Sequence, residues 1–308
     1  TFLRPNTTRS DAASTLMVSK RFILKRLLLL APVLFGVATL VFAILQLAPG
    51  DPARVIVGQR ASAEQIAQVR ADLGLNDPLW VQYGRFLFDA AQFEFGQSYK
   101  VAQGRAVRDV LADRLPVTIE LALYGQLLGI LLGIPLGVLS AIRQDSFTDH
   151  ATRVGALTGI SVPIFWSGPL LILLFSTYLG LLPASGRIGS AFFLSESWTL
   201  FGTELPLTGM VTIDTLLLGR FDAWTSAVQH LFMPAAVIGI QFGTLLGGAV
   251  LTETIFGIGG IGVTIVDAIG ASDYTLVQGT VLTFALLFTL VNLGVDITYS
   301  YLDPRIDQ

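Results

Sequence analysis

Long uncharged stretches alternate with polar segments along this chain. The first such stretch, residues 27–48, contains no charged residue and runs into Pro49-Gly50-Asp51-Pro52. The hydrocarbon core of a bilayer is about 30 Å thick and takes roughly 20 helical residues to cross. The stretch therefore predicts a membrane-spanning helix.

Four further apolar stretches follow, separated by polar segments. They cover residues 116–142, 154–186, 231–252 and 274–301. Each is long enough to cross a bilayer as a helix. The stretch at 154–186 contains prolines, which membrane helices tolerate where neighbouring groups satisfy the freed carbonyls. The pattern predicts an all-α polytopic membrane protein.

Basic residues gather before the first span, which predicts a cytoplasmic N-terminus. They are Arg4, Arg9, Lys20, Arg21, Lys25 and Arg26. Met17 is a plausible native start, so we give residues 1–16 no structural role. Five crossings would then leave residues 253–273 inside the cell, although that segment has three acidic residues and no Lys or Arg. Five spans do not give a consistent topology.

The polar region between the first two spans predicts short helices. Ser62 and Gln65 form a capping-box pair, and Gly74 suits the end of the helix that they begin. After a turn at Asn76-Asp77-Pro78, residues 79–93 have an amphipathic, aromatic pattern. Two interpretations stay open here, packing near the membrane interface and a small loop domain with its own core.

Composition excludes several chemistries. Hydrophobic residues make up 53% of the chain and charged residues 13%, with a mean hydropathy of +0.68 and a net charge of −3. There is no cysteine, so disulfides and thiolate metal sites are excluded. No lysine follows a glycine turn, so the chain has no Walker-type ATP site. Residues 257–262 match GxGxxG but follow a span rather than a strand, which predicts tight backbone packing and a bend.

Three carboxylates lie near the expected bilayer, namely Glu120, Glu253 and Asp296. Such groups usually face a polar cavity or pair with a partner. A position at the interface suits Glu120 and Glu253 equally well, so Asp296 is the better candidate for lining a pathway. The residues alone leave a transporter subunit, a secondary carrier or channel, and a structural scaffold open. A carrier would need matching broken helices in two halves, and no such internal symmetry is visible.

Several motifs, taken together, resemble one family: the membrane-spanning permease subunits of bacterial ABC importers for dipeptides and oligopeptides. The motifs extend over nearly all of residues 20–308, and the segment around Ile213-Asp214-Thr215 is most similar to the dipeptide-permease branch. The matching segments are Arg21 to Pro52, Leu73 to Tyr83, Arg114 to Ala141, Ser161 to Arg187, Gln241 to Gly279 and Val291 to Ile306.

The resemblance implies the type I ABC importer fold, with six spans and both termini cytoplasmic. The expected layout is a cytoplasmic tail (1–26), a first span (27–48), an extracytoplasmic helical region (49–115), a second span (116–142), a cytoplasmic loop (143–153), a third span (154–180), an extracytoplasmic loop (181–230), the start of a fourth span (231–240), part of a fifth (241–256), an extracytoplasmic re-entrant or edge segment (257–273), a sixth span (274–301) and a cytoplasmic tail (302–308).

The resemblance also implies that residues are missing at the Ile240–Gln241 junction. Parts of the fourth and fifth spans, and the coupling segment that docks into an ATPase subunit, have no counterpart in this sequence. A stretch missing from the sequence and a true deletion both explain this. We favour the missing stretch, because the flanking motifs are intact. A smaller departure is Gly259, where the family usually has proline.

By this resemblance, the chain is expected to form half of the translocation pathway of an ATP-driven importer in the bacterial inner membrane, and not to be an enzyme. The implied partners are a second permease, two cytoplasmic ATPases, an extracytoplasmic peptide-binding protein and membrane lipid, without nucleic acid. ATP and Mg²⁺ would bind the ATPases, so this chain itself would hold no cofactor or metal. Candidate pathway residues are Asp296, Glu253 and Gln241, and family-motif residues are Pro49, Gly50, Asp51, Pro52, Gly260 and Gly262.

Overall fold

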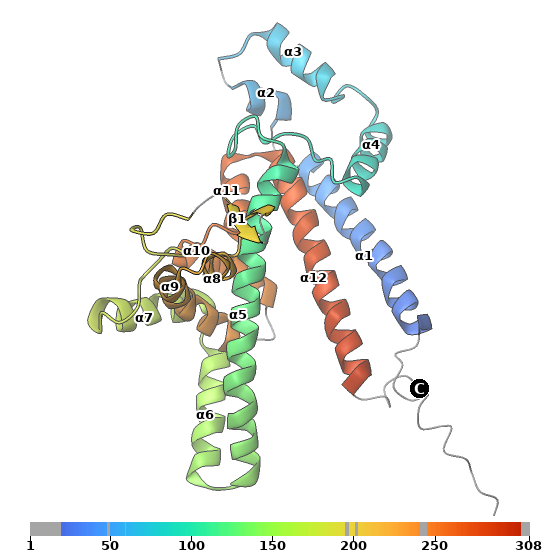
Figure 1. The fold of residues 1–308 in the computed structure, drawn as a ribbon. Coiled ribbons are helices and arrows are strands. Elements are labelled where there is room, and N and C mark those ends of the chain that lie inside the picture. Colours follow the sequence, from blue (N-terminus) through green and yellow to red (C-terminus); the bar gives the residue numbers. More distant parts are fainter. Residues whose placement is uncertain are drawn as a thin grey trace, which may run out of the picture. The chain divides into compact units, whose positions relative to one another are not determined.

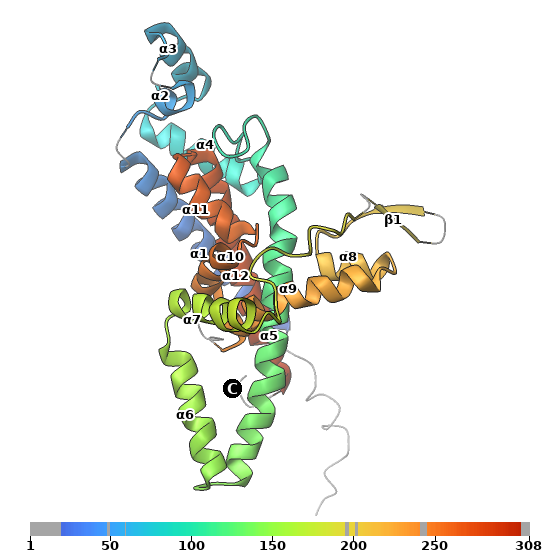
Figure 2. The same cartoon turned by 90° about the vertical axis from the view of Figure 1, so that its left-hand side faces the viewer.

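The computed structural model describes residues 20–47, 50–58, 60–194, 197–200, 203–240 and 245–302. It divides into two compact units. Unit 1 contains residues 1–92 and 281–308, and unit 2 contains residues 93–280. Figures 1 and 2 show the elements of both units.

Unit 1 begins with the long helix α1 and three short helices. These are α1 (Lys20–Leu47), α2 (Pro52–Val57), α3 (Ala63–Asp72) and α4 (Leu79–Ala91). The capping box predicted at Ser62 and Gln65 is present, with both reciprocal hydrogen bonds formed. Gly74 has a φ of +63°, a left-handed conformation that favours glycine after a helix. The local signals of this region are thus confirmed.

An aromatic cluster joins α1 to α4. The Phe42 ring lies 5.2 Å from that of Tyr83 and 5.6 Å from that of Phe86, measured between centroids. The Tyr83 hydroxyl lies 2.6 Å from Oγ1 of Thr39. Residues of α4 therefore pack against an apolar helix of membrane length, and the two interpretations of residues 79–93 both stay predictions.

Unit 2 holds most of the helices and one small hairpin. Its elements are α5 (Val107–Ile142), α6 (Phe147–Ser161), α7 (Ile164–Leu171), the π-helix η1 (Ile172–Tyr178), β1 (Ser197–Leu200), β2 (Thr203–Pro206), α8 (Val211–Leu217), α9 (Phe221–Ile240), α10 (Leu245–Phe256), α11 (Ile261–Ala271) and the start of α12 (Tyr274–Leu302). The antiparallel β1–β2 pair is an exception to the expected all-α fold.

Helix α5 is the central element of unit 2. It contacts α6, α9, α10 and α11, and α9 is its most extensive partner among the described elements (Figures 1 and 2). Their shared core is apolar and almost fully buried; it includes Val117, Leu121, Leu231, Met233, Val237, Ile238 and Phe256. Burial of such side chains stabilises the packing by roughly 25 cal/mol per Å² of apolar surface removed from water.

Four helices are long and apolar enough to cross a membrane, and two bent helix pairs raise this to as many as six spans within the described residues. One bent pair lies at the third span expected at 154–180: α6 and the α7–η1 helix meet at an angle of 109°. The break falls at Val162-Pro163, where Val162 is extended. Proline disfavours the helical conformation in the residue before it, which explains the break.

Two further expected segments coincide with elements of different extent. The second span, expected at 116–142, belongs to a helix that begins at Val107, because Val107, Val110 and Leu111 share a buried face despite their charged neighbours. The loop expected at 181–230 contains β1, β2, α8 and the first half of α9. Polar residues lower the mean hydropathy of that half of α9, so the sequence pattern does not reveal it, but Ala223 and Ala227 are buried on one of its faces.

The segment expected at 257–273 to be re-entrant or at an edge forms α11, which meets α10 at 83°. Gly257 stands at the bend with a φ of +62°. The amide of Ile258 donates to the carbonyl of Glu253, which caps the end of α10. The glycine-rich stretch therefore makes the tight turn that its sequence predicted.

Candidate functional site

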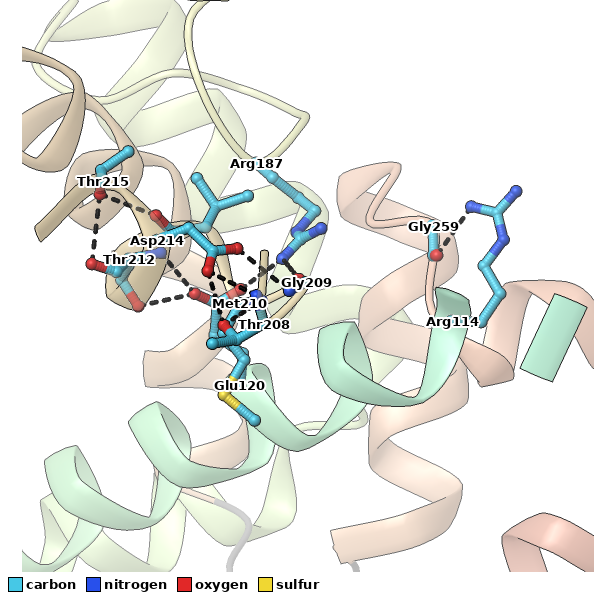
Figure 3. A network of polar contacts seen from close by, with 11 residues as sticks. Arg114, Glu120, Arg187, Thr208, Gly209, Met210, Thr212, Asp214, Thr215 and Gly259 are labelled. Atoms are coloured by element: carbon cyan, nitrogen blue, oxygen red, sulfur yellow. Dashed lines mark hydrogen bonds and ion pairs between the residues drawn. The ribbon is translucent and has the colours of Figure 1, made fainter. Parts of the chain in front are cut away.

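Helix α5 carries polar side chains into the apolar interior of unit 2. Arg114 and Thr118 lie one turn apart on the helix, so they share a face, and they contact the α10–α11 turn. Glu120 faces another direction and contacts Thr212 in the first turn of α8 (Figure 3). One helix thus takes part in two separate polar clusters, which we call joints because each holds other segments to α5: one is centred on Glu253 and the other on Glu120.

The first joint surrounds Glu253 of α10, whose side chain is fully buried. Its Oε1 accepts a hydrogen bond of 2.6 Å from the Thr118 hydroxyl, and its Oε2 accepts one of 3.2 Å from the amide of Val263. The Thr118 oxygen in turn accepts from the amide of Ile261 at 2.9 Å. The carboxylate lies at the N-terminus of α11, where helix amides favour a negative charge.

Glycines make room for this carboxylate. A Cβ atom on Gly260 would come closer than 3.0 Å to the carboxylate of Glu253. One on Gly262 would lie 2.6 Å from the Cα of Val250 and 2.8 Å from Oε2 of Glu253. These two family-motif glycines are therefore explained by close approach of a buried side chain. Arg114 adds a hydrogen bond of 2.9 Å to the carbonyl of Gly259 (Figure 3).

The second joint surrounds Glu120, which is 1% exposed. Its Oε2 pairs with Nη2 of Arg187 at 2.6 Å, and its Oε1 accepts from the amide and the hydroxyl of Thr212 at 2.7 and 2.6 Å. The same Nη2 donates to the carbonyl of Gly209 at 2.7 Å. Charge-assisted bonds of this kind are about twice as strong as neutral ones. They attach two distant segments to α5.

Asp214 accepts hydrogen bonds from the turn at Thr208 and Gly209, directly before α8. Its Oδ1 accepts from the amide and the hydroxyl of Thr208, and its Oδ2 accepts from the amide of Gly209 (Figure 3). Asp214 is 1% exposed and lies in the first turn of α8. The turn before α8 is therefore closed by one carboxylate and attached to α5 by another.

A further buried carboxylate, Asp273, lies between α11 and α12. Its Oδ2 accepts from the Ser98 hydroxyl at 2.6 Å and from the amides of Tyr99, Lys100 and Val101 at 3.0–3.2 Å. Burial would raise the pKa of Asp273, but these hydrogen bonds outweigh it and hold the pKa below the ordinary value. The ionised form is thus the one that the fold stabilises.

The structure describes some of the predicted site residues and not others. Glu253 is buried in the joint described above. Asp296 belongs to α12, but the structure describes only its backbone. Gln241 and Pro49 also lie outside the described residues. A role of Asp296, Glu253 and Gln241 in lining a pathway stays a prediction.

The motif that ends the first span acquires a structural explanation. Asp51 caps α2 by accepting from the amide of Ala53 at 3.1 Å, and Pro52 takes the first helical position. Asp51 also pairs with Arg70 of α3 at 2.8 Å, and Gly50 has a φ of +122°. The motif is thus a helix start.

Sequence reasoning missed the partners of the buried carboxylates. Arg187 and Thr118 stood inside recognised motifs, but nothing local linked Arg187 to Glu120, 67 residues away, or Thr118 to Glu253, 135 residues away. The described residues hold no group of three or more His, Cys, Asp or Glu side chains arranged for a metal ion. The joints position helices.

Comparison with known proteins agrees with this architecture. Residues 19–122 match the family described as the N-terminal part of the binding-protein-dependent transport system membrane component, and residues 235–308 match the binding-protein-dependent transport system inner membrane component. The chain is 36% identical over 343 residues to a dipeptide transport system permease protein of Escherichia coli K12, covering 93% of this chain and 98% of the relative.

Two other relatives extend the similarity. A dipeptide transport system permease protein of Alkalihalophilus pseudofirmus is 34% identical over 340 residues, covering 92% of this chain and 98% of the relative. A glutathione transport system permease protein of Shigella boydii is 34% identical over 302 residues, with the same coverage. This is a multi-pass membrane permease. The chain belongs to the family of binding-protein-dependent transport system inner membrane components.

Arg187→Met should destabilise unit 2, because it leaves the buried Glu120 without its counter-charge. Breaking a buried pair costs about 3–5 kcal/mol, and the 21% exposure of the Arg187 side chain puts the expected loss toward the lower end. Thermal unfolding in detergent, followed by intrinsic fluorescence, measures this. The double variant Glu120→Gln/Arg187→Met should recover most of the loss; equal destabilisation of both variants would contradict the ion-pair assignment.

Asp273→Asn should lower stability at neutral pH and weaken the response to acid. A carboxyl whose folded pKa is depressed stabilises the fold fully above the unfolded value, about 3.9, and loses that contribution as pH falls through the folded value. The acid unfolding midpoint, followed by near-UV circular dichroism from pH 7 to 2, reports the difference. Asp109→Asn, which removes an exposed carboxylate of the same unit, is the control; identical acid profiles for both variants would refute the assignment.

Proposed function

We propose that this chain is a permease subunit forming half of the translocation pathway of an ATP-driven importer for dipeptides or short oligopeptides. The observation that carries the proposal is the similarity to dipeptide permeases over 98% of their length. Fold alone would not indicate a cargo. The relatives named for dipeptides and for glutathione have small peptides in common as their cargo.

The chain needs partners for this function. We expect a second permease to provide the other half of the pathway, two cytoplasmic ATPases to bind ATP and Mg²⁺, and an extracytoplasmic peptide-binding protein to deliver the cargo. The complex would lie in the bacterial inner membrane, with both termini of this chain in the cytoplasm. The family description, which names binding-protein dependence and the inner membrane, supports this composition.

The mechanism is alternating access driven by differential affinity. ATP binding and hydrolysis favour two states of the ATPases, and a ligand shifts a conformational equilibrium only by its different affinity for the two states. The extracytoplasmic segments 53–115 and 181–230 would meet the binding protein and gate the outer mouth. The joints at Glu120 and Glu253 suit this role, because they hold helices and turns to α5 as units that can move together.

Reconstitution tests the function directly. Proteoliposomes containing this chain, its second permease and the two ATPases should take up a labelled dipeptide when the binding protein and ATP are both supplied. Uptake should stop when ATP is withheld or replaced by a non-hydrolysable analogue. Uptake driven by a proton gradient without ATP would contradict the proposal and favour a secondary carrier.

Asp296→Asn tests the pathway assignment. If the Asp296 carboxylate lines the pathway, the variant should assemble normally and transport several-fold more slowly. Ionisable residues at membrane depth usually face the substrate pathway, so removal of this charge should weaken the interaction with the passing cargo. Co-purification of the partner subunits measures assembly, and initial uptake rates measure transport. Asp222→Asn, at an exposed position in the first turn of α9, is the matched control. Unchanged uptake in the Asp296 variant would remove this residue from the pathway.

A further inference from the structure

Helix α8 buries its polar side chains and exposes apolar ones. Its three polar residues are each 1% exposed or less: Thr212, Asp214 and Thr215. By contrast, Ile213, Leu216 and Leu217 are 41%, 51% and 43% exposed. Residues three and four apart lie side by side on a helix, so these aliphatic side chains form one surface, which we call the apolar face of α8. An amphipathic helix on a water-facing surface has the reverse arrangement.

Contacts within unit 2 occupy the polar side of α8. Oε1 of Glu120 accepts from the amide and the hydroxyl of Thr212, and Asp214 accepts from the turn before the helix (Figure 3). The Thr215 hydroxyl donates to the carbonyl of Val211 at 2.7 Å. These contacts fix which side of α8 is turned toward the interior of unit 2. The apolar face is therefore turned away from it.

Two helices of membrane length indicate the level of α8 in the bilayer. Its first turn is attached to Glu120 of α5, in the span expected to begin at residue 116. Four helical residues rise about 6 Å, so this contact lies near the border between acyl chains and headgroups. At its other end α8 leads, through residues 218–220, into α9, which is also long and apolar enough to cross a membrane. Helix α8 thus lies between the beginnings of two spans.

Charged and aromatic residues follow the apolar face along the chain. Arg220 and Asp222 lie 3.7 Å apart, with side chains that are 37% and 63% exposed, and Phe221 between them is 66% exposed. The Arg220 guanidinium also lies 5.9 Å from the centre of the Phe192 ring and donates to the carbonyl of Phe193. Charged groups next to exposed aromatic and aliphatic side chains are typical of a helix in the membrane interface.

The composition of the apolar face favours lipid over a protein partner. Close contacts between helices in a membrane use small residues, whereas this face consists of one isoleucine and two leucines. A transient protein interface is about as polar as the rest of a protein surface, and these three side chains have no donor or acceptor to offer it. Acyl chains need no hydrogen-bonding partner, so they can cover such a face at no polar cost.

We propose that α8 lies in the membrane interface, with Ile213, Leu216 and Leu217 in contact with the acyl chains of the surrounding phospholipids. An interfacial helix buries its apolar face about 5–10 Å into the boundary between headgroups and acyl chains. The choice of the extracytoplasmic leaflet rests on the proposed topology, whereas the lipid contact does not. Only the remaining parts of the segment 181–230 are then free to meet the binding protein.

Quenching by brominated lipid tests the proposal. The chain contains no cysteine, so Leu216→Cys provides a unique site in it for an environment-sensitive fluorophore. In the assembled importer in phosphatidylcholine vesicles, this label should fluoresce several-fold less when the acyl chains are brominated. Gln103→Cys, at an exposed position before α5, is the matched control and should not respond to bromination. An importer with the unsubstituted chain gives the background from cysteines of its partners.

The competing occupants of the apolar face give different results. Fluorescence that ignores bromination but changes when the binding protein is added would assign the face to that protein. Blue-shifted emission that responds to neither would assign it to the second permease, and emission like that of the Gln103 label would leave it in water. Each of these three results would overturn the proposal. Leu217→Cys, on the same face, repeats the measurement if the first variant does not assemble.

Aspartate substitutions provide an independent readout. The double variant Leu216→Asp/Leu217→Asp would place two carboxylates among acyl chains, so the yield of folded complex should fall several-fold. Gln103→Asp is the control and should match the unsubstituted chain. Size-exclusion chromatography of fluorescently tagged variants measures the folded fraction. A double variant that behaves like Gln103→Asp would contradict the lipid contact. Neither test measures uptake, so a failed function proposal leaves their interpretation unchanged.

Discussion

The cost of burying a carboxylate governs the structure of unit 2. An unpaired charge in a medium of low dielectric constant is several kcal/mol less stable than in water, and a bilayer offers no water to compensate. Glu120, Glu253, Asp214 and Asp273 are all 1% exposed or less. Each therefore needs donors within reach; those of Asp214 are five and six residues away, whereas Glu120, Glu253 and Asp273 have donors from segments far away in sequence. The packing of helices on α5 follows from this requirement as much as from apolar contact.

The donors are of two kinds, and the difference matters for how rigid each joint is. Glu120 accepts from a flexible guanidinium as well as from the amide and hydroxyl of Thr212, whereas Glu253 and Asp273 accept from backbone amides and hydroxyls. A backbone amide has no rotamer freedom to lose, so it holds its acceptor at little conformational cost. The joints at Glu253 and Asp273 therefore fix the position of a turn. A transporter that alternates between states needs a few such rigid bodies that move against one another.

Local sequence patterns predicted many of the helix starts and ends, but they could not predict which distant side chains pair with the buried carboxylates. The capping box at Ser62 and the left-handed Gly74 depend on neighbours within a few residues, so sequence alone found them. Hydropathy located most of the long apolar helices but missed the start of α9 and the break at Pro163, because it averages over amphipathic faces and bends. The carboxylate partners depend on which helices pack together, and no single sequence contains that information.

Asp273 gives α12 an unusual attachment. One carboxylate oxygen accepts from the loop at residues 98–101, and the other accepts from Thr275 and from the amide of Leu276 in the first turn of α12. The short Asp273 side chain, held by several hydrogen bonds at each of its oxygens, is the link between helix and loop, so a rotation at the start of α12 should move that loop as well. The loop thus behaves mechanically as part of the helix, although more than 170 residues separate them in the chain.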